Sequence, residues 1–247
     1  MTDKKLYLTR AQLISELGRC LGCKSKPCMN ACPVNCNPQE FIAKAKANDF
    51  AGAVETITRN NPMGQTCGLS CPDKFCMQAC TRAGIDFPIN IPRVQATILE
   101  KYRTAESAAH PKLPANGKKV AVIGAGPAGI AATAKLSRLG YRITLFESFE
   151  KIGGALNLIP DKRLPFEVIA KDWSFIDDPD MIELRLNTPV NNPAALLEQD
   201  FDGVIVATGE PEGINLGIDG EEHAVSYLDY LRHPEHYAAR GNIAVIG

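Results

Sequence analysis

Nine cysteines lie between residues 20 and 80, and none follows in the rest of the 247-residue chain. Spacing this close lets one loop wrap several corners of an iron–sulfur cube. In two-cluster ferredoxins the last cysteine of a run binds the other cluster, and such crossed ligation would tie together short helices that bury little core alone. Eight of the cysteines form two runs, Cys20-x2-Cys23-x4-Cys28-x3-Cys32 and Cys67-x3-Cys71-x4-Cys76-x3-Cys80.

Zinc and disulfide bonds are the alternatives for these thiols. Two structural zinc sites could use eight cysteines, but zinc sites usually contain paired Cys-x2-Cys knuckles or histidines. The chain has one Cys-x2-Cys pair, and its first histidine is His110. Disulfides would require an export route, whereas clustered cysteines in a reducing compartment indicate metal or redox chemistry. At least one of the nine cysteines is spare, and a small buried thiol is its default role.

The overall composition excludes two classes of partner. The 27 basic and 28 acidic side chains leave a formal net charge of −1, so no basic surplus indicates a nucleic-acid ligand. The longest apolar stretch, near residues 120–134, is too short for a bilayer and is broken by glycines. The N-terminal segment MTDKKLYLTRAQLISEL has no apolar signal core. We therefore expect a cytoplasmic protein with no nucleic-acid or membrane partner.

Helix signals between the cysteines predict an all-α domain over residues 1–103. Thr9, Asn37 and Asp49 each precede a helical pattern of apolar residues and are expected as N-caps. A further helix is expected to follow Pro92. The N-terminal domain is thus predicted to consist of short helices joined by cysteine-bearing loops.

A βαβ unit follows a polar linker. Residues 104–118 contain two prolines and are expected to form the linker. The segment after them, KVAVIGAGPAGIAATAKLSRLGYRITLFE, predicts strands over residues 120–123 and 141–146 with a helix over residues 127–139 between them. We expect an α/β Rossmann-type domain over residues 119–240.

The turn after the first strand has the dinucleotide-binding pattern. Gly124 permits a tight turn, Gly126 lets the backbone approach a pyrophosphate, and Gly129 lets the helix and the strand pack closely. The helix N-terminus then faces the pyrophosphate with unpaired N–H groups. Glu147, at the end of the second strand, can accept hydrogen bonds from ribose hydroxyls. The motif alone does not separate FAD from NAD.

Two later stretches favour FAD, and the last residues suggest a second nucleotide unit. The pair Gly153-Gly154 suits close passage along the adenosine arm of a flavin. FDGVIVATG, residues 201–209, predicts a strand whose small-residue turn returns the chain to the nucleotide. The chain ends on GNIAVIG, residues 241–247, which is similar to the first strand of another dinucleotide-binding domain. We therefore expect a truncated relative or an excised piece of a longer protein.

Together these motifs resemble a family of FAD- and iron–sulfur-containing NAD(P)H oxidoreductase subunits. The family includes the small (beta) subunit of glutamate synthase and the N-terminal half of dihydropyrimidine dehydrogenase. The resemblance implies an α+β fold, with an alpha-helical ferredoxin-like domain holding two [4Fe-4S] clusters followed by an incomplete Rossmann-type FAD domain. It runs from about Ala11 to Gly247 and is carried by CLGCKSKPCMNACP, CGLSCPDKFCMQACTRAG, PINIPRVQ, VAVIGAGPAG, RLP and ATG.

The resemblance also implies which residues bind the cofactors. In the dihydropyrimidine dehydrogenase branch a glutamine after PINI completes a cluster, and Gln95 has that place in PINIPRVQ. Cys36 and Cys67 are left spare. The implied residues are Cys20, Cys23, Cys28 and Cys80 for one cluster, Cys32, Cys71, Cys76 and Gln95 for the other, and Gly124, Gly126, Pro127, Ala128, Gly129, Glu147, Gly154 and Arg163 for FAD.

The function implied is electron transfer from NAD(P)H through FAD and the two clusters to a partner oxidoreductase subunit or domain. Relatives bind NAD(P)H in a second Rossmann unit, so the nicotinamide is expected in the complete protein. No catalytic side chain is expected, and His223, His233 and His236 are expected to be surface or packing residues. The alternatives are an iron–sulfur electron carrier with weak or no flavin and a metal-stabilised assembly module without turnover.

Overall fold

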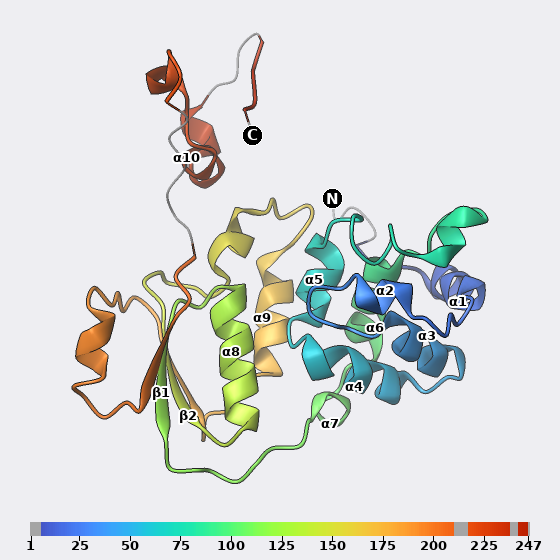
Figure 1. Ribbon diagram of the computed structural model, residues 1–247, viewed down its shortest axis with the longest axis horizontal. Helices are drawn as coiled ribbons and strands as arrows, with labels where there is room; N and C mark the ends of the chain where they lie inside the picture. Colours follow the sequence, from blue (N-terminus) through green and yellow to red (C-terminus); the bar gives the residue numbers. More distant parts are fainter. Residues whose placement is uncertain (1–5, 210–216, 238–241, 247) are drawn as a thin grey trace.

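The computed structural model describes residues 6–209, 217–237 and 242–246. Figure 1 shows a helical N-terminal part packed beside a parallel sheet, with two helices of the second part between them. The expected combination of a helical domain and an α/β domain is thus confirmed. The helices of the first part are α1 Arg10–Arg19, α2 Pro27–Asn30, α3 Pro38–Lys46, α4 Phe50–Asn60, α5 Gly64–Ser70, η1 Thr81–Gly84, α6 Ile91–Tyr102 and α7 Ala105–Ala108.

Side-chain caps begin most of the longer helices where the sequence predicts them. Thr9 forms a reciprocal capping box with Gln12 at the start of α1. Asn37 and Asp49 accept from backbone amides in the first turns of α3 and α4. α6 begins one residue before Pro92, because Asn90 accepts from the amide of Arg93 and serves as its N-cap. These hydrogen bonds form within the first turn of each helix, so they set where the helix begins without tertiary contacts.

The core of the helical part lies between α1, α3, α4 and α6. Leu13, Phe41, Val54, Ile57 and Ile98 are among the side chains there with at most 1% exposure. These positions recur every three or four residues along their helices, so each helix presents one apolar face inward. The cysteine loops connect these helices at the edge of the core, which holds the loops in place.

The second part is built on a four-stranded parallel sheet. The strand order is β3-β2-β1-β4, and Val122 of β1 lies opposite Leu145 of β2 and Ile205 of β4. One face packs against α8 and α9, and the other face is partly covered by η3. The elements are β1 Lys119–Ile123, α8 Pro127–Arg138, β2 Arg142–Phe146, η2 Gly154–Leu158, α9 Phe166–Ser174, β3 Ile182–Arg185, η3 Pro193–Leu196 and β4 Gly203–Val206.

The segment between the two parts is more ordered than a linker. Thr104 caps α7 in a box with Ser107, and Ala108 is buried in the helical core. Beyond α7 the chain has no regular element until β1, but Leu113 and Asn116 donate to the last carbonyls around the end of α8. The prediction of a linker over residues 104–118 is therefore wrong for the first residues of that range, because a capped turn buries them.

A buried ion pair joins the two parts. The Asp172 carboxylate of α9 lies 2.6 Å from Arg103, which follows α6, and both side chains are fully buried. Asp172 also accepts from the amides of Gln65 at 3.4 Å and Thr66 at 2.8 Å. These amides belong to the first turn of α5, whose own N-cap residue Met63 supplies no side-chain hydrogen bond. The Rossmann part thus caps a helix of the iron–sulfur part.

The C-terminal residues add small helical elements but no strand. In Figure 1 they extend beyond one end of the sheet. Residues 242–246 are not paired with any other described residue as a strand, and the side chain of Val245 is 91% exposed. The expected strand at 241–247 is therefore absent from its described part, since a strand needs a ladder partner, while residues 241 and 247 lie outside the described residues. The elements here are η4 Glu221–His223, α10 Tyr227–Arg232 and η5 Pro234–His236.

None of the helices in the described ranges is long and apolar enough to cross a membrane.

Candidate cofactor-binding sites

Four cysteines from both runs line one cavity in the helical part. Cys20 ends α1, Cys23 and Cys28 lie in and beside the loop that leads into α2, and Cys80 precedes η1. All four line the cavity together with apolar side chains such as Ile42. We call these four residues the first-cluster group. They are the four that the family resemblance implied for one cluster.

The cysteines of the first-cluster group lie close enough together to change the pKa of a neighbouring thiol. Burial raises the pKa of the Cys28 thiol, and the nearby Cys20 and Cys80 raise it further because two neighbouring thiolates repel each other. Cys23 Sγ lies 3.4 Å from the hydroxyl of Thr81, the residue after Cys80. A site of this kind stabilises thiolates only when a cation shares it, as a metal cluster would.

A second group lies where α5 and α6 pack together. Burial raises the pKa of Cys76 to about 12, with further contributions from nearby Cys32 and Cys71. Cys71 ends α5, and a hydrogen bond from the thiol of Cys67 lowers its pKa to about 7. Gln95, on α6, is 7% exposed. We call Cys32, Cys71, Cys76 and Gln95 the second-cluster group.

The buried Cys36 lies between Gln95 and the cysteines of the second-cluster group. The amide nitrogen of Gln95 donates to the carbonyl of Gly64 at 2.6 Å, and its amide oxygen lies 3.6 Å from Cys36 Sγ. Burial raises the pKa of Cys36, and the nearby Cys32 and Cys76 also raise it. In the sequence, the only indication that Cys36 is buried is that it is one of the cysteines left over from the two clusters.

Zinc ions and four-iron clusters place their ligand sulfurs at different spacings. Tetrahedral zinc holds sulfur at about 2.3 Å, so its ligand sulfurs lie about 4 Å apart. Among the residues that the structure describes, which include all nine cysteines, no three sulfurs lie within 4.8 Å of one another. Thiolates of a four-iron cluster are spaced more widely because each binds a different iron. No three of the described cysteines are therefore already arranged as ligands of one zinc ion.

The glycine turn lies at the carboxyl end of the sheet. Gly124 has a φ of +100°, and a Cβ on it would lie 2.5 Å from the carbonyl oxygen of Ala207. A Cβ on Gly129 would lie 1.8 Å from the carbonyl oxygen of Gly124. Pro127 and Ala128 form the first turn of α8, whose N-terminus points at this edge. The ATG stretch thus returns to the turn, as expected from the sequence.

Glu147 and Gly154 complete the edge of the turn. Glu147 is 5% exposed, and its carboxylate accepts from the amides of Ala125 at 2.8 Å and Phe149 at 3.0 Å. A carboxylate has about four acceptor positions, so capacity for a further donor remains. Gly154 has a φ of +52°, and a Cβ on it would lie 2.9 Å from Cα of Gly126. Seven of the residues predicted for FAD therefore meet at one edge, with backbone space that side chains would fill.

Asn157 adds an acceptor that the sequence analysis missed. Its side-chain nitrogen donates to the carbonyl of Ile152, whereas its buried Oδ1 has no hydrogen-bond partner. A Cβ on Gly153 would lie 3.2 Å from that oxygen, so the orphaned atom is beside the glycine pair. A buried polar atom without a partner is costly, and a hydroxyl or N–H group of a bound nucleotide would satisfy it. This residue supports a nucleotide at the turn, although no motif marks it in the sequence.

Arg163, the eighth residue predicted for FAD, lies at the boundary between the two parts. Its guanidinium donates to the carbonyl of Ser70 at 3.1 Å. Ser70 is the last residue of α5 and directly precedes Cys71. The side chain is exposed, and this hydrogen bond is made to the helical part of the protein. It therefore links the loop after η2 to the second-cluster group.

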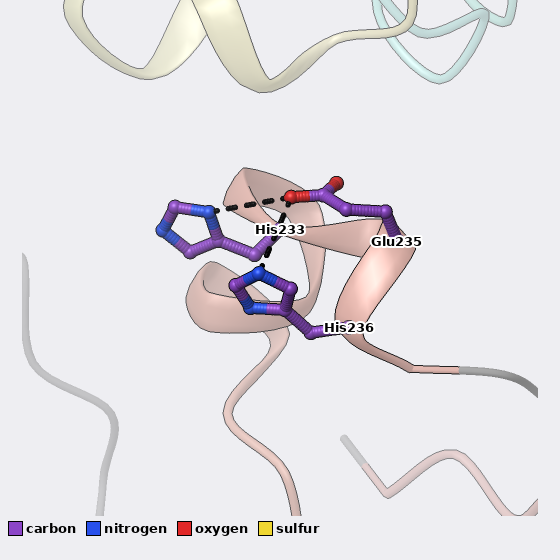
Figure 2. A group of neighbouring side chains, drawn as sticks. All are labelled: His233, Glu235 and His236. Carbon is purple, nitrogen blue, oxygen red and sulfur yellow. Dashed lines mark ion pairs between the residues drawn. The ribbon is translucent and has the colours of Figure 1, made fainter.

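The histidines near the C-terminus lie on the surface, as predicted. Figure 2 shows His233 and His236 beside Glu235, with the carboxylate 3.7 Å and 3.6 Å from their ring nitrogens. The two rings stack with an interplanar angle of 13°. A metal ion bound by both imidazoles must lie in both ring planes, because the nitrogen lone pairs lie in those planes. Stacked, nearly parallel rings do not meet this condition, so the cluster has the character of surface packing.

Comparisons with known proteins identify the cysteine-bearing part. Residues 1–107 match the family described as dihydropyrimidine dehydrogenase domain II, 4Fe-4S cluster. Residues 122–174 match the NAD(P)-binding Rossmann-like domain. The resemblance based on the cysteine runs and PINIPRVQ is therefore confirmed for the dihydropyrimidine dehydrogenase branch, together with the assignments of a 4Fe-4S domain and a Rossmann-like nucleotide domain.

Curated relatives match the chain across both parts. It is 35% identical over 237 residues to the NAD-dependent dihydropyrimidine dehydrogenase subunit PreT of Escherichia coli K12, covering 94% of this chain and 57% of the relative. PreT of Salmonella typhimurium is 36% identical over 238 residues with the same coverage. NADPH-Fe(3+) oxidoreductase subunit beta of Geobacter sulfurreducens is 30% identical over 237 residues, covering 93% of this chain and 34% of the relative. The chain thus spans a little over half the length of the PreT relatives.

Proposed function

We propose that the chain is the electron-transfer part of an NAD(P)H-linked iron–sulfur flavoprotein. The observation that carries the proposal is the contact of Arg163, predicted for FAD, with Ser70, the neighbour of Cys71. It brings the loop beyond the glycine turn to the helix that ends at the second-cluster group. Two redox cofactors that exchange electrons need such proximity, and the named relatives are oxidoreductase subunits.

The residues of the chain have separate tasks in this proposal. When bound, the flavin takes two electrons together and releases them singly to the clusters. The N-terminus of α8 and the side chain of Glu147 would bind and orient the dinucleotide. Gly124 and Gly154 allow the close backbone packing that forms the turn, and Gly126 would let a pyrophosphate approach the backbone. The apolar walls around the first-cluster group limit the access of water to the thiolates.

We further propose two [4Fe-4S] clusters of unequal charge. The first-cluster group supplies four thiolates, and the second-cluster group supplies three thiolates and the neutral amide of Gln95. Replacing a thiolate by an amide changes the net charge of a cluster, and net charge is one of the factors that set its reduction potential. The two clusters would therefore differ in potential, which gives electrons a preferred direction.

The electron donor and the acceptor are proposed from the names of the relatives. By analogy with the PreT relatives, which are named NAD-dependent subunits, we propose that NAD(P)H is the electron donor. The acceptor is a partner oxidoreductase subunit or domain, with a dihydropyrimidine dehydrogenase subunit the nearest candidate.

Anaerobic purification of the chain with metal and flavin analysis tests the proposal. We expect about eight irons per polypeptide after reconstitution, because two four-iron clusters are proposed, together with flavin absorption bands. Iron without flavin would instead favour an electron carrier. Zinc without iron would favour an assembly module, and either result would contradict the proposed flavoprotein.

A further inference from the structure

Cys36 is a buried cysteine outside both cluster groups. It lies two positions before Pro38, the first residue of α3, and its side chain is 2% exposed. Its sulfur lies 3.6 Å from Oε1 of Gln95, within the range of a sulfur hydrogen bond. Gln95 Oε1 can only accept a hydrogen bond, so the thiol is the donor. The contact therefore requires the Cys36 proton and points it at the predicted cluster ligand.

The orientation of the Gln95 amide follows from its other contact. Its nitrogen donates to the carbonyl oxygen of Gly64 at 2.6 Å, and two oxygens would repel each other there. The amide oxygen must consequently face the opposite side, where Cys36 lies. Gly64 can come this close because it has no side chain: a Cβ would lie 2.7 Å from Leu99 and 2.8 Å from Ile57. The two contacts hold both ends of the amide.

We propose that Cys36 is a positioning residue that holds the Gln95 oxygen toward the second cluster and tunes that cluster by hydrogen bonding. The inference rests on the proposed function, since it needs a cluster at the second-cluster group. An amide oxygen has two acceptor positions, so one can receive the Cys36 thiol while the other binds iron. Partners that orient a metal ligand in this way also alter its electron donation.

The physical effect has a definite sign. A hydrogen bond withdraws electron density from the ligand oxygen and stabilises the more reduced, more negative state of the cluster. Removing the donor should therefore lower the reduction potential of the Gln95-bound cluster and leave the other cluster unchanged. A merely structural role for Cys36 would alter stability without a shift confined to one cluster.

Four single variants of the anaerobically reconstituted chain test the proposal by iron analysis, EPR and potentiometric titration. Gln95→Leu identifies which EPR signal belongs to the Gln95-bound cluster. Cys36→Ala and Cys36→Val remove the donor, and Val keeps the site filled where Ala leaves a cavity. We expect both to shift that signal and lower its midpoint potential with the iron content retained. Cys36→Ser keeps an O–H donor and should restore values toward those of the wild type.

Three outcomes would overturn the inference. If Cys36→Ala and Cys36→Val match the wild type in signal and potential, the hydrogen bond has no role in tuning. If all three Cys36 variants, serine included, lose about four irons, Cys36 is itself a cluster ligand. A wild-type chain that holds no second cluster would contradict the proposed function and this inference together. The first outcome leaves the proposed function intact, and the second contradicts only its use of Gln95 as the fourth ligand.

Discussion

Single side chains in this protein have their protonation set by a few neighbours. His110, between the two parts, lies 2.9 Å from the hydroxyl of Thr58. That hydroxyl already donates to the carbonyl of Val54, so Nε2 of the imidazole is the donor to Thr58. Burial, together with the positive charge of Arg138, lowers the pKa of His110 to about 4. The neutral ring is therefore the form that suits the folded chain.

Stability should decrease as pH falls through the range in which His110 titrates. The imidazole has a folded pKa of about 4 and an unfolded value of about 6.5. Between these two pH values the unfolded chain binds more protons than the folded chain. The free energy of unfolding therefore decreases as the pH is lowered. We expect the thermal midpoint to drop between pH 7 and pH 5, with a smaller drop in His110→Gln. The same change at the exposed His223 is the control, and equal slopes in both variants would refute the assignment.

At the scale of elements, the packing of α8 against the glycine turn requires the backbones of Gly124 and Gly129 to lie close together. The backbone of Gly129 packs so near Gly124 that any side chain would collide with a carbonyl oxygen at 1.8 Å. Neither backbone can move without shifting β1 or α8, which flank the turn on its two sides. Gly18, near the end of α1, is different, because a Cβ there meets nothing within 4 Å.

Opposite effects are therefore expected from the same substitution at these two glycines. Gly129→Ala should lower the free energy of unfolding by about 1–3 kcal/mol and weaken flavin retention, because overpacking displaces the turn. Gly18→Ala should raise it by up to about 1 kcal/mol, since alanine reduces the freedom of the unfolded chain. Denaturant titration measures the free energy of unfolding of each variant, and the flavin content of the purified protein measures flavin retention. A neutral Gly129→Ala would contradict the packing at the turn.

The sequence predicts elements well where local chemistry alone decides them. Thr9, Asn37 and Asp49 were recognisable as caps because their hydrogen bonds form within one turn. No prediction was made for β3 or α9: β3 has four residues, and α9 has no N-terminal side-chain cap. The cluster groups mix distant runs, as Cys80 does with Cys20, so spacing alone could not assign them.

At the scale of the whole molecule, the contact between the two parts is polar and buried. Arg103 and Asp172 have no exposed side-chain area, and Arg103 also donates to the side chain of Gln65 at 2.9 Å. The guanidinium lies 4.2 Å from the ring centroid of Phe175. Nearby, Lys171 and Glu100 form a partly exposed pair across the same boundary. Loss of one partner should destabilise the buried pair more than the exposed pair, because a buried charge that loses its partner cannot be solvated by water.

Removing one partner of the buried pair should loosen both parts together. Asp172→Ala should lower the free energy of unfolding by about 3–5 kcal/mol, because it leaves Arg103 buried without its counter-ion. Lys171→Ala, which breaks the exposed pair, should cost at most about 1 kcal/mol. Denaturant unfolding followed by circular dichroism and by cluster absorption checks both. Equal effects of the two substitutions would contradict the importance of burial.

The capping of α5 by Asp172 has a consequence for how the protein is made. Thr66 leaves the ribosome 106 positions before the carboxylate that receives its amide. Until that acidic residue has been translated and α9 has docked, the first turn of α5 has no side-chain partner, and the segment leading to Cys71 is incompletely held. We therefore expect a ribosome-stalled fragment that ends before α9 to acquire metal less completely than the full chain.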